Sequence, residues 1–423
     1  MAVTDSHTRR GGPSGPPETQ GTASDAIDGV VPRIVAQPES AEDVAAILAS
    51  ASQERTSVVV RGGGTKLAWG RTPSPIDIVL STKRLNRLVA HEHADLTATA
   101  QAGARIDDVN RELARHGQWL PIESAFEGAT IGGAIATNDS GPMRHRYGTP
   151  RDLLIGIRLA LTDGRVIKSG GNVVKNVAGY DLGKLISGSF GSLAAIVSAT
   201  FKLTPLPAAS STLIATFDNA AGLVAALSAI TSSQLEASTC EVHASALHSP
   251  AGAGHYHLLL KFESTPGALN AHVQKARALV GDARCEVVAA VTESEAWRDH
   301  GRVLWTSPGM VVKAAWLPAS LGGVLAFVGE MREHGTDVEL SGRAALGSGL
   351  FRIDGDVSTQ RAAAERMRSR PDLFRHVVLL RASTELKQTI DVWGSLGDAA
   401  ALGAAVKHAL DPQGILNAGR GPV

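Results

Sequence analysis

The sequence predicts an α+β fold in two parts, and three observations support this prediction. A β-branched run at residues 57–60 leads directly into three glycines at 62–64, the pattern of a strand followed by a tight loop. Beyond the proline-rich segment 205–207, strand and helix patterns alternate to about residue 380. The length of 423 residues corresponds to about two or three domains at roughly 150 residues each.

The N-terminal segment, residues 1–28, is rich in Gly, Pro, Ser and Thr and lacks the apolar run of a secretory signal. Its low hydrophobicity predicts a disordered tail. We expect order to begin near Val30. The expected division is a first domain at 29–207, a second domain at 208–390 and a C-terminal segment at 391–423 that returns to the first domain.

The first half should open with a helix that begins after Ser40. Ser40 and Asp43 have the spacing of a reciprocal cap, and Val44 and Leu48 lie on one apolar stripe. An Asp-Gly pair at 163–164 predicts a hairpin turn. The other elements expected here are strands at 57–60, 76–80, 154–161 and 193–204, and a helix at about 106–113.

The second half should be an antiparallel α+β domain, because strands and helices alternate in it without the pattern of a parallel sheet. Strands are expected at 211–217, 256–262, 310–316 and 376–380. Helices are expected at 220–232, 268–280, 320–334 and 359–368. A last helix at 398–410 is expected to pack on the first half.

Composition excludes several classes of function. Lys plus Arg and Asp plus Glu number 41 each, which gives no electrostatic reason to expect a nucleic acid or an anionic membrane as partner. No run of about 18 apolar residues predicts a transmembrane helix. Cys240 and Cys285 are far apart, and no His or Cys spacing matches a metal site, so we expect no metal and a reducing, cytoplasmic setting.

Three glycine-rich segments carry the main functional signal. Glycine turns after a strand expose backbone N–H groups that bind oxyanions such as phosphate. The segments at 61–65, 127–138 and 188–192 together suit a long ligand that lies extended across the domain. A tight turn without a ligand is the structural alternative for each segment alone. No GxGxxG opens a helix after a strand, which excludes the dinucleotide-binding fingerprint.

The order of the motifs is more specific than any one of them. They are RGGGT (61–65), LP-x(6)-GATIGGAIATN (120–138), RYGTPRD (146–152), KNVAGYDL (175–182), GSFGSL (188–193) and DPQGILNAGR (411–420). This set resembles the vanillyl-alcohol-oxidase or PCMH type of FAD-binding flavoprotein, most closely the FAD-binding subunit (GlcE) of bacterial glycolate oxidase. The resemblance covers about residues 30–207 and the last dozen residues.

The resemblance implies a PCMH-type FAD-binding domain of two subdomains with an inserted α+β cap domain. It also implies the cofactor-binding residues Arg61, Gly62, Gly63, Gly64, Thr65, Gly128, Ala129, Thr130, Gly132, Gly133, Thr137, Asn138, Gly188, Gly191, Ile196 and Asn417. The 61–65 segment would hold the pyrophosphate, and 188–196 the adenosine end. Many relatives carry a histidine that bonds covalently to the flavin where Thr65 stands, so we expect FAD to bind noncovalently.

The catalytic residue stays unassigned, because the His-Gly-Asp-Gly-Asn type of segment found in 2-hydroxyacid dehydrogenases is absent. The nearest segment, 352–356, has no histidine. The candidates for substrate or flavin contact are Arg144, Tyr147, Lys175, Arg343 and Arg352, where an Arg fork would anchor a carboxylate. A solvated loop or a buried polar network is the structural alternative for each. Trp297, Trp305 and Trp316 are expected in the cap core, with one of them free to stack on flavin, and Glu286, Glu293, Glu295 and Glu330 on solvated helix faces.

The resemblance implies a subunit that oxidises glycolate, or a related 2-hydroxy acid, to glyoxylate by hydride transfer to flavin. A second FAD-binding flavoprotein subunit and an iron–sulfur subunit would be its partners, since this chain lacks cysteines for a cluster. Such a complex allows peripheral association with the inner face of the membrane. The alternatives are a self-sufficient D-lactate-type dehydrogenase, a non-catalytic electron-relay subunit, and an oxidase of alditols or sugars.

Overall fold

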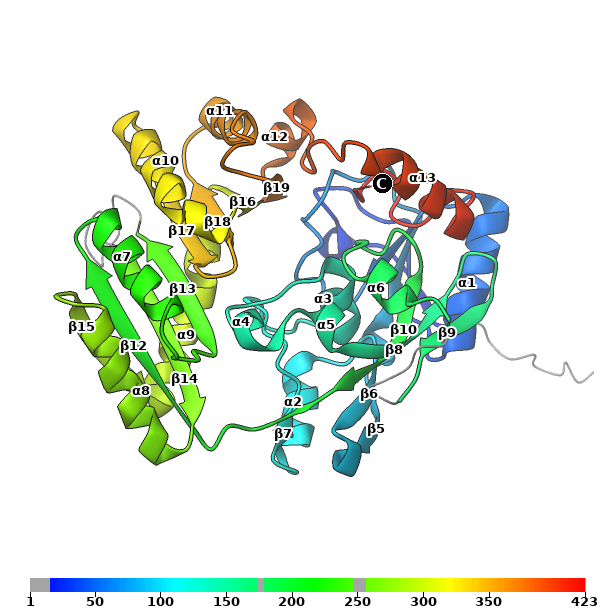
Figure 1. The fold of residues 1–423 in the computed structure, drawn as a ribbon. Coiled ribbons are helices and arrows are strands. Elements are labelled where there is room, and N and C mark those ends of the chain that lie inside the picture. The colour runs from blue at the N-terminus through cyan, green and yellow to red at the C-terminus, as the bar shows by residue number, and fades with distance from the viewer. Residues whose placement is uncertain (1–15, 173–178, 246–255, 423) are drawn as a thin grey trace, which may run out of the picture.

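The computed structural model describes residues 16–172, 179–245 and 256–422 of the chain. Figure 1 shows two lobes side by side, joined at the bottom of the view by one extended segment that leads into β12. The first lobe contains a four-stranded, a five-stranded and a small two-stranded sheet, and the second is built around a single large sheet.

The first sheet of the N-terminal lobe has the order β1-β2-β4-β3. Its strands are β1 (Glu18–Gln20), β2 (Ile34–Ala36), β3 (Val58–Arg61) and β4 (Ile78–Ser81). Strands β2 and β3 run parallel to β4, so helix α1 (Ala41–Glu54) crosses between β2 and β3. The predicted cap is confirmed, because the Ser40 hydroxyl accepts from the Asp43 amide and Asp43 accepts from the Ser40 amide.

A disordered tail was expected over residues 1–28, but residues 16–28 are ordered in the structure. Strand β1 pairs antiparallel with β2, and Ile27 is buried. Asp28 accepts a hydrogen bond of 2.7 Å from the Lys387 ammonium group, which lies in the other lobe and is almost completely buried. The composition of this segment is polar, but Asp25 pairs with Arg61 of the first lobe and Asp28 pairs with Lys387 of the second.

The second sheet is antiparallel, in the order β5-β6-β10-β8-β9. Its strands are β5 (Leu88–Glu92), β6 (Thr97–Gln101), β8 (Leu154–Ala160), β9 (Val166–Gly170) and β10 (Ala195–Lys202). Helices α2 (Ile106–Ala114) and α3 (Ile131–Thr137) pack against it in one apolar core. The predicted hairpin is confirmed, with Gly164 at φ +87° in the turn between β8 and β9.

Short elements complete this lobe. They are α4 (Arg144–Tyr147), α5 (Pro150–Leu153), α6 (Leu182–Ile186), and the paired strands β7 (Gln118–Trp119) and β11 (Thr204–Pro205).

The second lobe is an eight-stranded sheet of order β15-β12-β14-β13-β17-β18-β16-β19, antiparallel throughout as predicted. The strands are β12 (Ala209–Phe217), β13 (Thr239–Ala244), β14 (Tyr256–Ser264), β15 (Arg284–Ala289), β16 (Met310–Ala315), β17 (Val338–Arg343), β18 (Ser348–Ile353) and β19 (His376–Arg381). The helices are α7 (Ala220–Thr231), α8 (Pro266–Leu279), α9 (Ala290–Thr306), α10 (Leu321–Glu333), α11 (Val357–Arg368) and α12 (Thr384–Thr389).

The two faces of this large sheet differ in polarity. Side chains alternate along a strand, so Cys240, Val242, Leu340 and Phe351 point to one face, where they join an apolar core with α7, α8, α10 and α11. Their neighbours in β13, β16, β17 and β18 point to the other face, which is packed against α9. That second face carries the charged residues Glu241, Lys313, Glu339, Arg343 and Arg352.

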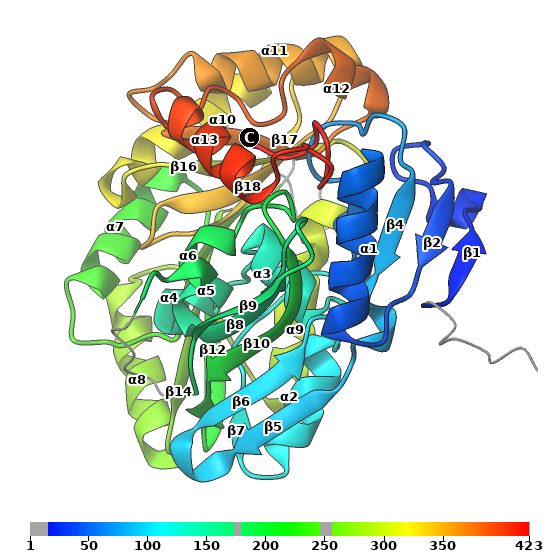
Figure 2. The ribbon, with the colours of Figure 1, turned by 90° about the vertical axis from the view of Figure 1, so that its right-hand side faces the viewer.

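The C-terminal segment returns to the first lobe. Helix α13 (Ala399–Leu410) lies beside α1 and α6 in both views (Figures 1 and 2). The Lys407 ammonium group donates to the Ser192 carbonyl oxygen at 2.7 Å, and Leu416 forms a bridge with Val58. These contacts support the division at about residues 207 and 390, which we retain as a proposal. Among the residues described, no helix combines the length and apolar character needed to span a bilayer.

The first prediction concerns the buried pair of Asp28 and Lys387. Asp28→Ala should lower the free energy of unfolding by about 3 kcal/mol, because it leaves an unpaired charge at Lys387. Asp95→Ala, at an exposed position, should change it by less than about 0.5 kcal/mol. Urea unfolding followed by tryptophan fluorescence measures both, and equal effects would show that residues 16–28 do not dock as described.

Candidate functional site

A narrow channel runs between the two predicted glycine loops. It has a volume of about 100 Å³ and is lined by residues 62–67 on one side and by Thr130, Gly132 and Gly133 on the other. The loops approach so closely that a Cβ atom on Gly63 would lie 2.0 Å from the Gly128 carbonyl oxygen. A Cβ on Gly62 would lie 2.2 Å from the Thr130 hydroxyl oxygen. Only glycine fits at these two positions.

The loop at 62–66 presents free backbone donors to this channel. The amide groups of these five residues donate no hydrogen bond to any described residue. Consecutive free amides form a concave site for an anion, and a pyrophosphate supplies the oxygen acceptors that they lack. The structure therefore fits the expected FAD pyrophosphate at this loop without needing a lysine or arginine from the loop itself.

The returning C-terminal motif closes the other side of the channel. Asn417 is buried, its amide group donates to the Phe190 carbonyl oxygen, and its backbone N–H donates to Val58. Arg420, which the sequence analysis did not single out, is also buried in the channel wall. Its Nε atom has no hydrogen-bond partner among the described residues, so a donor stands ready for an anion. The only sequence signal for Arg420 was its place in the DPQGILNAGR motif.

The other predicted cofactor residues separate into three groups. Thr65, Thr137, Gly191 and Ile196 line the narrow channel. Ala129, Asn138 and Gly188 line the larger cavity described next, which Thr137 also reaches. Two do not line either space: Gly128 supports the Gly63 turn, and Arg61 forms an ion pair of 2.8 Å with Asp25.

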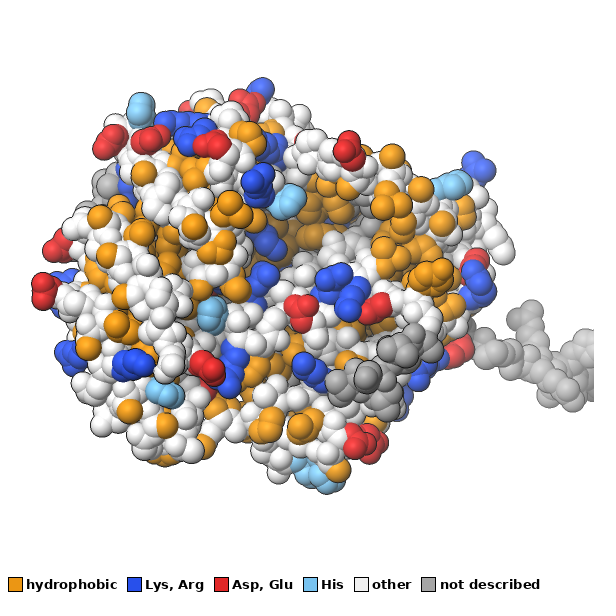
Figure 3. Space-filling view, viewed as in Figure 1, with side chains coloured by type: hydrophobic (Ala, Val, Ile, Leu, Met, Phe, Trp, Pro, Cys, Tyr) orange, Lys and Arg blue, Asp and Glu red, His pale blue; other side chains and the backbone are white. Residues whose placement is uncertain are grey.

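A larger cavity of about 1290 Å³ lies between the two lobes and shares Trp69, Thr137 and Phe190 with the channel. The space-filling view shows a hollow between the lobes, with Lys and Arg side chains gathered around it (Figure 3). Stacked and edge-to-face rings line it near the channel, with Trp69 and Trp305 at 5.7 Å between centroids. The predicted candidates Trp297 and Trp305 both line the cavity, whereas Trp316 belongs to the cap core.

Among the seven Lys and Arg residues that line this cavity, three lie close enough to influence one another's charge: Arg144 from α4, Arg343 from β17 and Lys313 from β16. Arg343 donates to the Ser140 carbonyl oxygen at 2.9 Å and lies 3.7 Å from the Glu241 carboxylate. The side chains of Arg144 and Lys313 form no hydrogen bond or ion pair with the described residues. Arg144 and Lys313 are therefore free to bind an anion that enters the cavity.

The electrostatic environment of Lys313 reflects this crowding of positive charge. Its side chain is exposed on the wall of the cavity, within the recess between the two lobes. Burial, together with Arg144 and Arg343, lowers the pKa of Lys313 to about 8. Burial and Arg343 also lower the pKa of Arg144. Lys313 is not among the site residues expected from the sequence, and its only sequence signal is a charged position in a strand of otherwise apolar residues.

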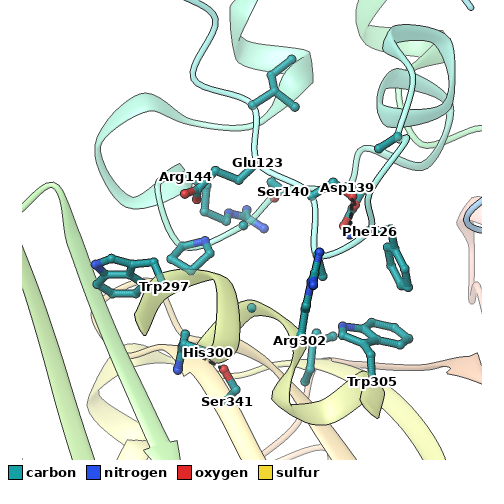
Figure 4. A pocket seen from close by; sticks show the side chains of 18 of the residues that line it. Glu123, Phe126, Asp139, Ser140, Arg144, Trp297, His300, Arg302, Trp305 and Ser341 are labelled. Atoms are coloured by element: carbon teal, nitrogen blue, oxygen red, sulfur yellow. Dashed lines mark hydrogen bonds between the residues drawn. The ribbon is translucent and has the colours of Figure 1, made fainter. Parts of the chain in front are cut away.

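Two acidic groups face these cations. Glu123 accepts a hydrogen bond of 2.7 Å from the Met143 amide, and burial raises its pKa to about 7. Glu241 is almost completely buried in β13, where it lies 3.4 Å from His300 Nε2. Figure 4 shows Glu123 and Arg144 on the wall of the N-terminal lobe, opposite His300, Ser341 and Trp297 on the cap wall.

The remaining predicted residues contact other protein groups or fall outside the described part of the chain. Arg352 is buried in an ion pair of 3.1 Å with Glu339 and does not line the cavity. The Tyr147 hydroxyl donates to Glu263 at 2.7 Å and ties α4 to the cap. Lys175 falls outside the described residues. Glu293 corrects the expectation of a solvated face, because it is buried and accepts from the hydroxyls of Ser210 and Thr212.

Comparison with known proteins identifies the nucleotide-binding part of this chain. Residues 32–170 match the family model of the FAD binding domain. Glycolate oxidase subunit GlcD of Bacillus subtilis is 34% identical over 212 residues, which are 50% of this chain and 45% of that protein. D-lactate dehydrogenase of Archaeoglobus fulgidus is 39% identical over 172 residues, 41% of this chain and 39% of that protein. The matches thus span less than half the length of these relatives.

Solved structures match over nearly the whole chain and show the fold. An alkyldihydroxyacetonephosphate synthase aligns with a TM-score of 0.70 at 18% identity and covers 92% of this chain and 76% of its own. A Physcomitrella patens BBE-like 1 protein aligns with a TM-score of 0.69 at 13% identity and covers 96% of both chains. The expected PCMH-type FAD-binding fold is confirmed, and FAD is the cofactor of this domain.

The second prediction concerns the glycine channel. Gly63→Ala should weaken FAD binding by about 1 to 3 kcal/mol, because the added Cβ displaces the loop from Gly128. That is roughly a 5- to 150-fold rise in the dissociation constant. Titration of the FAD-free chain by flavin fluorescence measures it. Gly267→Ala, where a Cβ meets nothing within 4 Å, is the matched control and should bind FAD as the unmodified chain does.

Proposed function

We propose that this chain is an FAD-dependent oxidoreductase that oxidises glycolate, or a related small 2-hydroxy acid, to the 2-oxo acid. One observation carries the proposal: the cavity that continues from the FAD channel ends at three converging cations, two of which lack a protein partner among the described residues. Such a cluster suits a carboxylate next to the reacting carbon. The named relatives act on acids of this class or form part of a glycolate oxidase.

The residues of the chain have separable roles in this proposal. Bound FAD supplies the hydride acceptor for the reaction. Arg144, Arg343 and Lys313 hold the substrate carboxylate and orient the 2-carbon. The ring cluster that includes Trp69 and Trp305 excludes water at the junction with the channel.

We propose that FAD binds noncovalently through the channel residues. Thr65 lines the channel, and its hydroxyl group offers no ring nitrogen for the covalent link that the histidine makes in related proteins. The free amides at 62–66 and the unpaired Arg420 Nε supply the contacts to the pyrophosphate. Acid precipitation of the FAD-loaded chain should therefore leave yellow FAD in the supernatant, and pigment retained in the pellet would contradict this.

We further propose that a second flavoprotein subunit and an iron–sulfur subunit receive the electrons. Cys240 is buried and Cys285 lies in a different strand, so these two thiols do not form a cluster site. The self-sufficient dehydrogenase remains the second candidate, because the carboxylate-binding cations and a buried His–Glu pair all belong to this chain. Reduction of the isolated chain by substrate distinguishes it from an electron-relay subunit.

The test of the proposed function is anaerobic reduction of the FAD-loaded chain. We expect glycolate, D-lactate or D-2-hydroxyglutarate to bleach the visible flavin absorbance within the time of catalytic turnover. Propane-1,2-diol has the carbon skeleton of lactate without its carboxylate and should not bleach it, and neither should sorbitol. Bleaching by sorbitol but not by any 2-hydroxy acid would contradict the proposal, as would an FAD-loaded chain that none of these compounds reduces.

The pH dependence of substrate capture follows from Lys313. The ammonium form attracts the carboxylate, and its pKa is lowered to about 8, so kcat/KM should fall as the pH rises through about 8. Lys313→Met should raise KM roughly 10- to 100-fold and remove this fall. Lys313→Arg keeps the charge at every pH and should retain capture while also losing the fall. A Lys313→Met variant with the pH profile of the unmodified chain would contradict the assignment.

A further inference from the structure

The large cavity has a buried imidazole on its cap wall, and the roles described so far do not use this group. His300 comes from helix α9, and its side chain is 5% exposed. Its Nε2 atom lies 3.4 Å from the Glu241 carboxylate and 3.2 Å from the Ser341 hydroxyl oxygen. Its Nδ1 atom forms no hydrogen bond with the described residues, while the residue lines the cavity (Figure 4).

The partners of His300 fix its orientation and tautomer. A carboxylate beside Nε2 favours the proton on that nitrogen, which leaves the lone pair of the neutral ring on Nδ1. Glu241 is itself held near Arg343, with 3.7 Å between the Arg343 Nε and Glu241 Oε1 atoms. The rings of Trp297 and His243 enclose the imidazole at centroid distances of 5.5 and 5.9 Å.

The other charged groups near this site are either paired with one another or are cations. His243 is paired with Glu339 at 2.8 Å, and Glu339 is paired with Arg352. Lys261 lies 3.6 Å from Glu263. Lys313 and Arg144 line the same cavity as cations. His300 therefore combines an orienting carboxylate with a free basic nitrogen at the cavity wall.

We propose that His300 is the catalytic base that accepts the hydroxyl proton of the substrate, with Glu241 as its positioning residue. This inference rests on the proposed function of a 2-hydroxy acid oxidoreductase. The O–H bond of the C2 alcohol would break and its proton would pass to His300 Nδ1. FAD, held by the channel residues, would supply the acceptor for the hydride of the C2–H bond and its two electrons. The alcohol becomes the 2-oxo acid, and the imidazolium is stabilised by Glu241.

Glu123 is the competing base in the same cavity, because its raised pKa of about 7 suits proton transfer. Its geometry favours a structural role. One carboxylate oxygen accepts from the Met143 amide at 2.7 Å, and the carboxylate packs against Gly141, where a Cβ would lie 2.7 Å from Glu123 Oε2. Glu123 thus holds the loop that precedes α4 and positions Arg144.

The test compares His300→Ala with the unmodified FAD-loaded chain in anaerobic flavin reduction by the best 2-hydroxy acid. Loss of a general base should slow reduction by about 100- to 10,000-fold. Visible FAD content should stay the same. So should the change in flavin absorbance on adding oxalate, an analogue of a 2-hydroxy acid that has no C–H bond and therefore no hydride to transfer. Added imidazole should restore the reduction rate in proportion to its neutral form, a signature that a merely structural role does not give.

Three further variants make the outcome decisive. His116→Ala, at an exposed position on the other lobe, is the matched control and should be reduced as fast as the unmodified chain. Glu241→Gln should lower kcat more than it raises KM, because it acts on the proton transfer through His300. Glu123→Gln should keep more than a tenth of the rate and gain nothing from imidazole.

Each remaining outcome overturns the proposal. His300 is not the base if the His300→Ala variant is reduced at the normal rate. It is also not the base if this variant binds FAD and oxalate but its reduction is not accelerated by imidazole. Loss of the rate in Glu123→Gln with its retention in His300→Ala assigns the base to Glu123. If the unmodified chain itself is not reduced by any 2-hydroxy acid, the proposed function fails and this role fails with it, a result distinct from the failure of the variant alone.

Discussion

The close approach of two glycine turns is the constraint on which the whole site depends. A Cβ on Gly63 would lie 2.0 Å from the Gly128 carbonyl oxygen, so the strand–loop unit at 58–66 and the segment before α3 can meet only as bare backbone. This contact leaves five consecutive amides without protein acceptors, facing a channel. Anion binding then needs no charged side chain from the loop, and Arg420 from the far end of the chain completes the wall.

The cap contributes to the site through the polar face of its sheet. Alternation along β13, β16, β17 and β18 sends apolar side chains to the core and charged ones toward α9 and the cavity. Deep in this face the charges pair, as in Arg352 with Glu339. At the cavity wall the pairing is incomplete: Lys313 is left without a partner among the described residues, and Arg343 Nε lacks a hydrogen bond. Since Arg144, Arg343 and Lys313 repel one another, a bound carboxylate is expected to offset this repulsion.

The sequence was most informative where backbone constraints act, and least where tertiary pairing decides. The glycine loops, the Ser40 cap and the helices expected at 220–232, 268–280, 320–334 and 359–368 follow local rules, and the structure contains these elements as α7, α8, α10 and α11 and the cap of α1. Strand β17 was not predicted, because Glu339, Ser341 and Gly342 interrupt its apolar pattern. Helix α9 was not predicted, because Ala289 at its N-terminus has no side chain that could cap the helix. The roles of Arg352, Lys313 and His300 depend on which sheet face and which partner they meet, and a single sequence does not specify these.

A crystal structure of the FAD-loaded chain with oxalate would test the central claim most directly. The account predicts the pyrophosphate at the amides of residues 62–66, the flavin ring at the junction of channel and cavity, and an oxalate carboxylate bound by Arg144, Arg343 and Lys313. His300 Nδ1 should then face the ligand. FAD bound away from the channel, or oxalate bound outside the cavity between the lobes, would contradict the account.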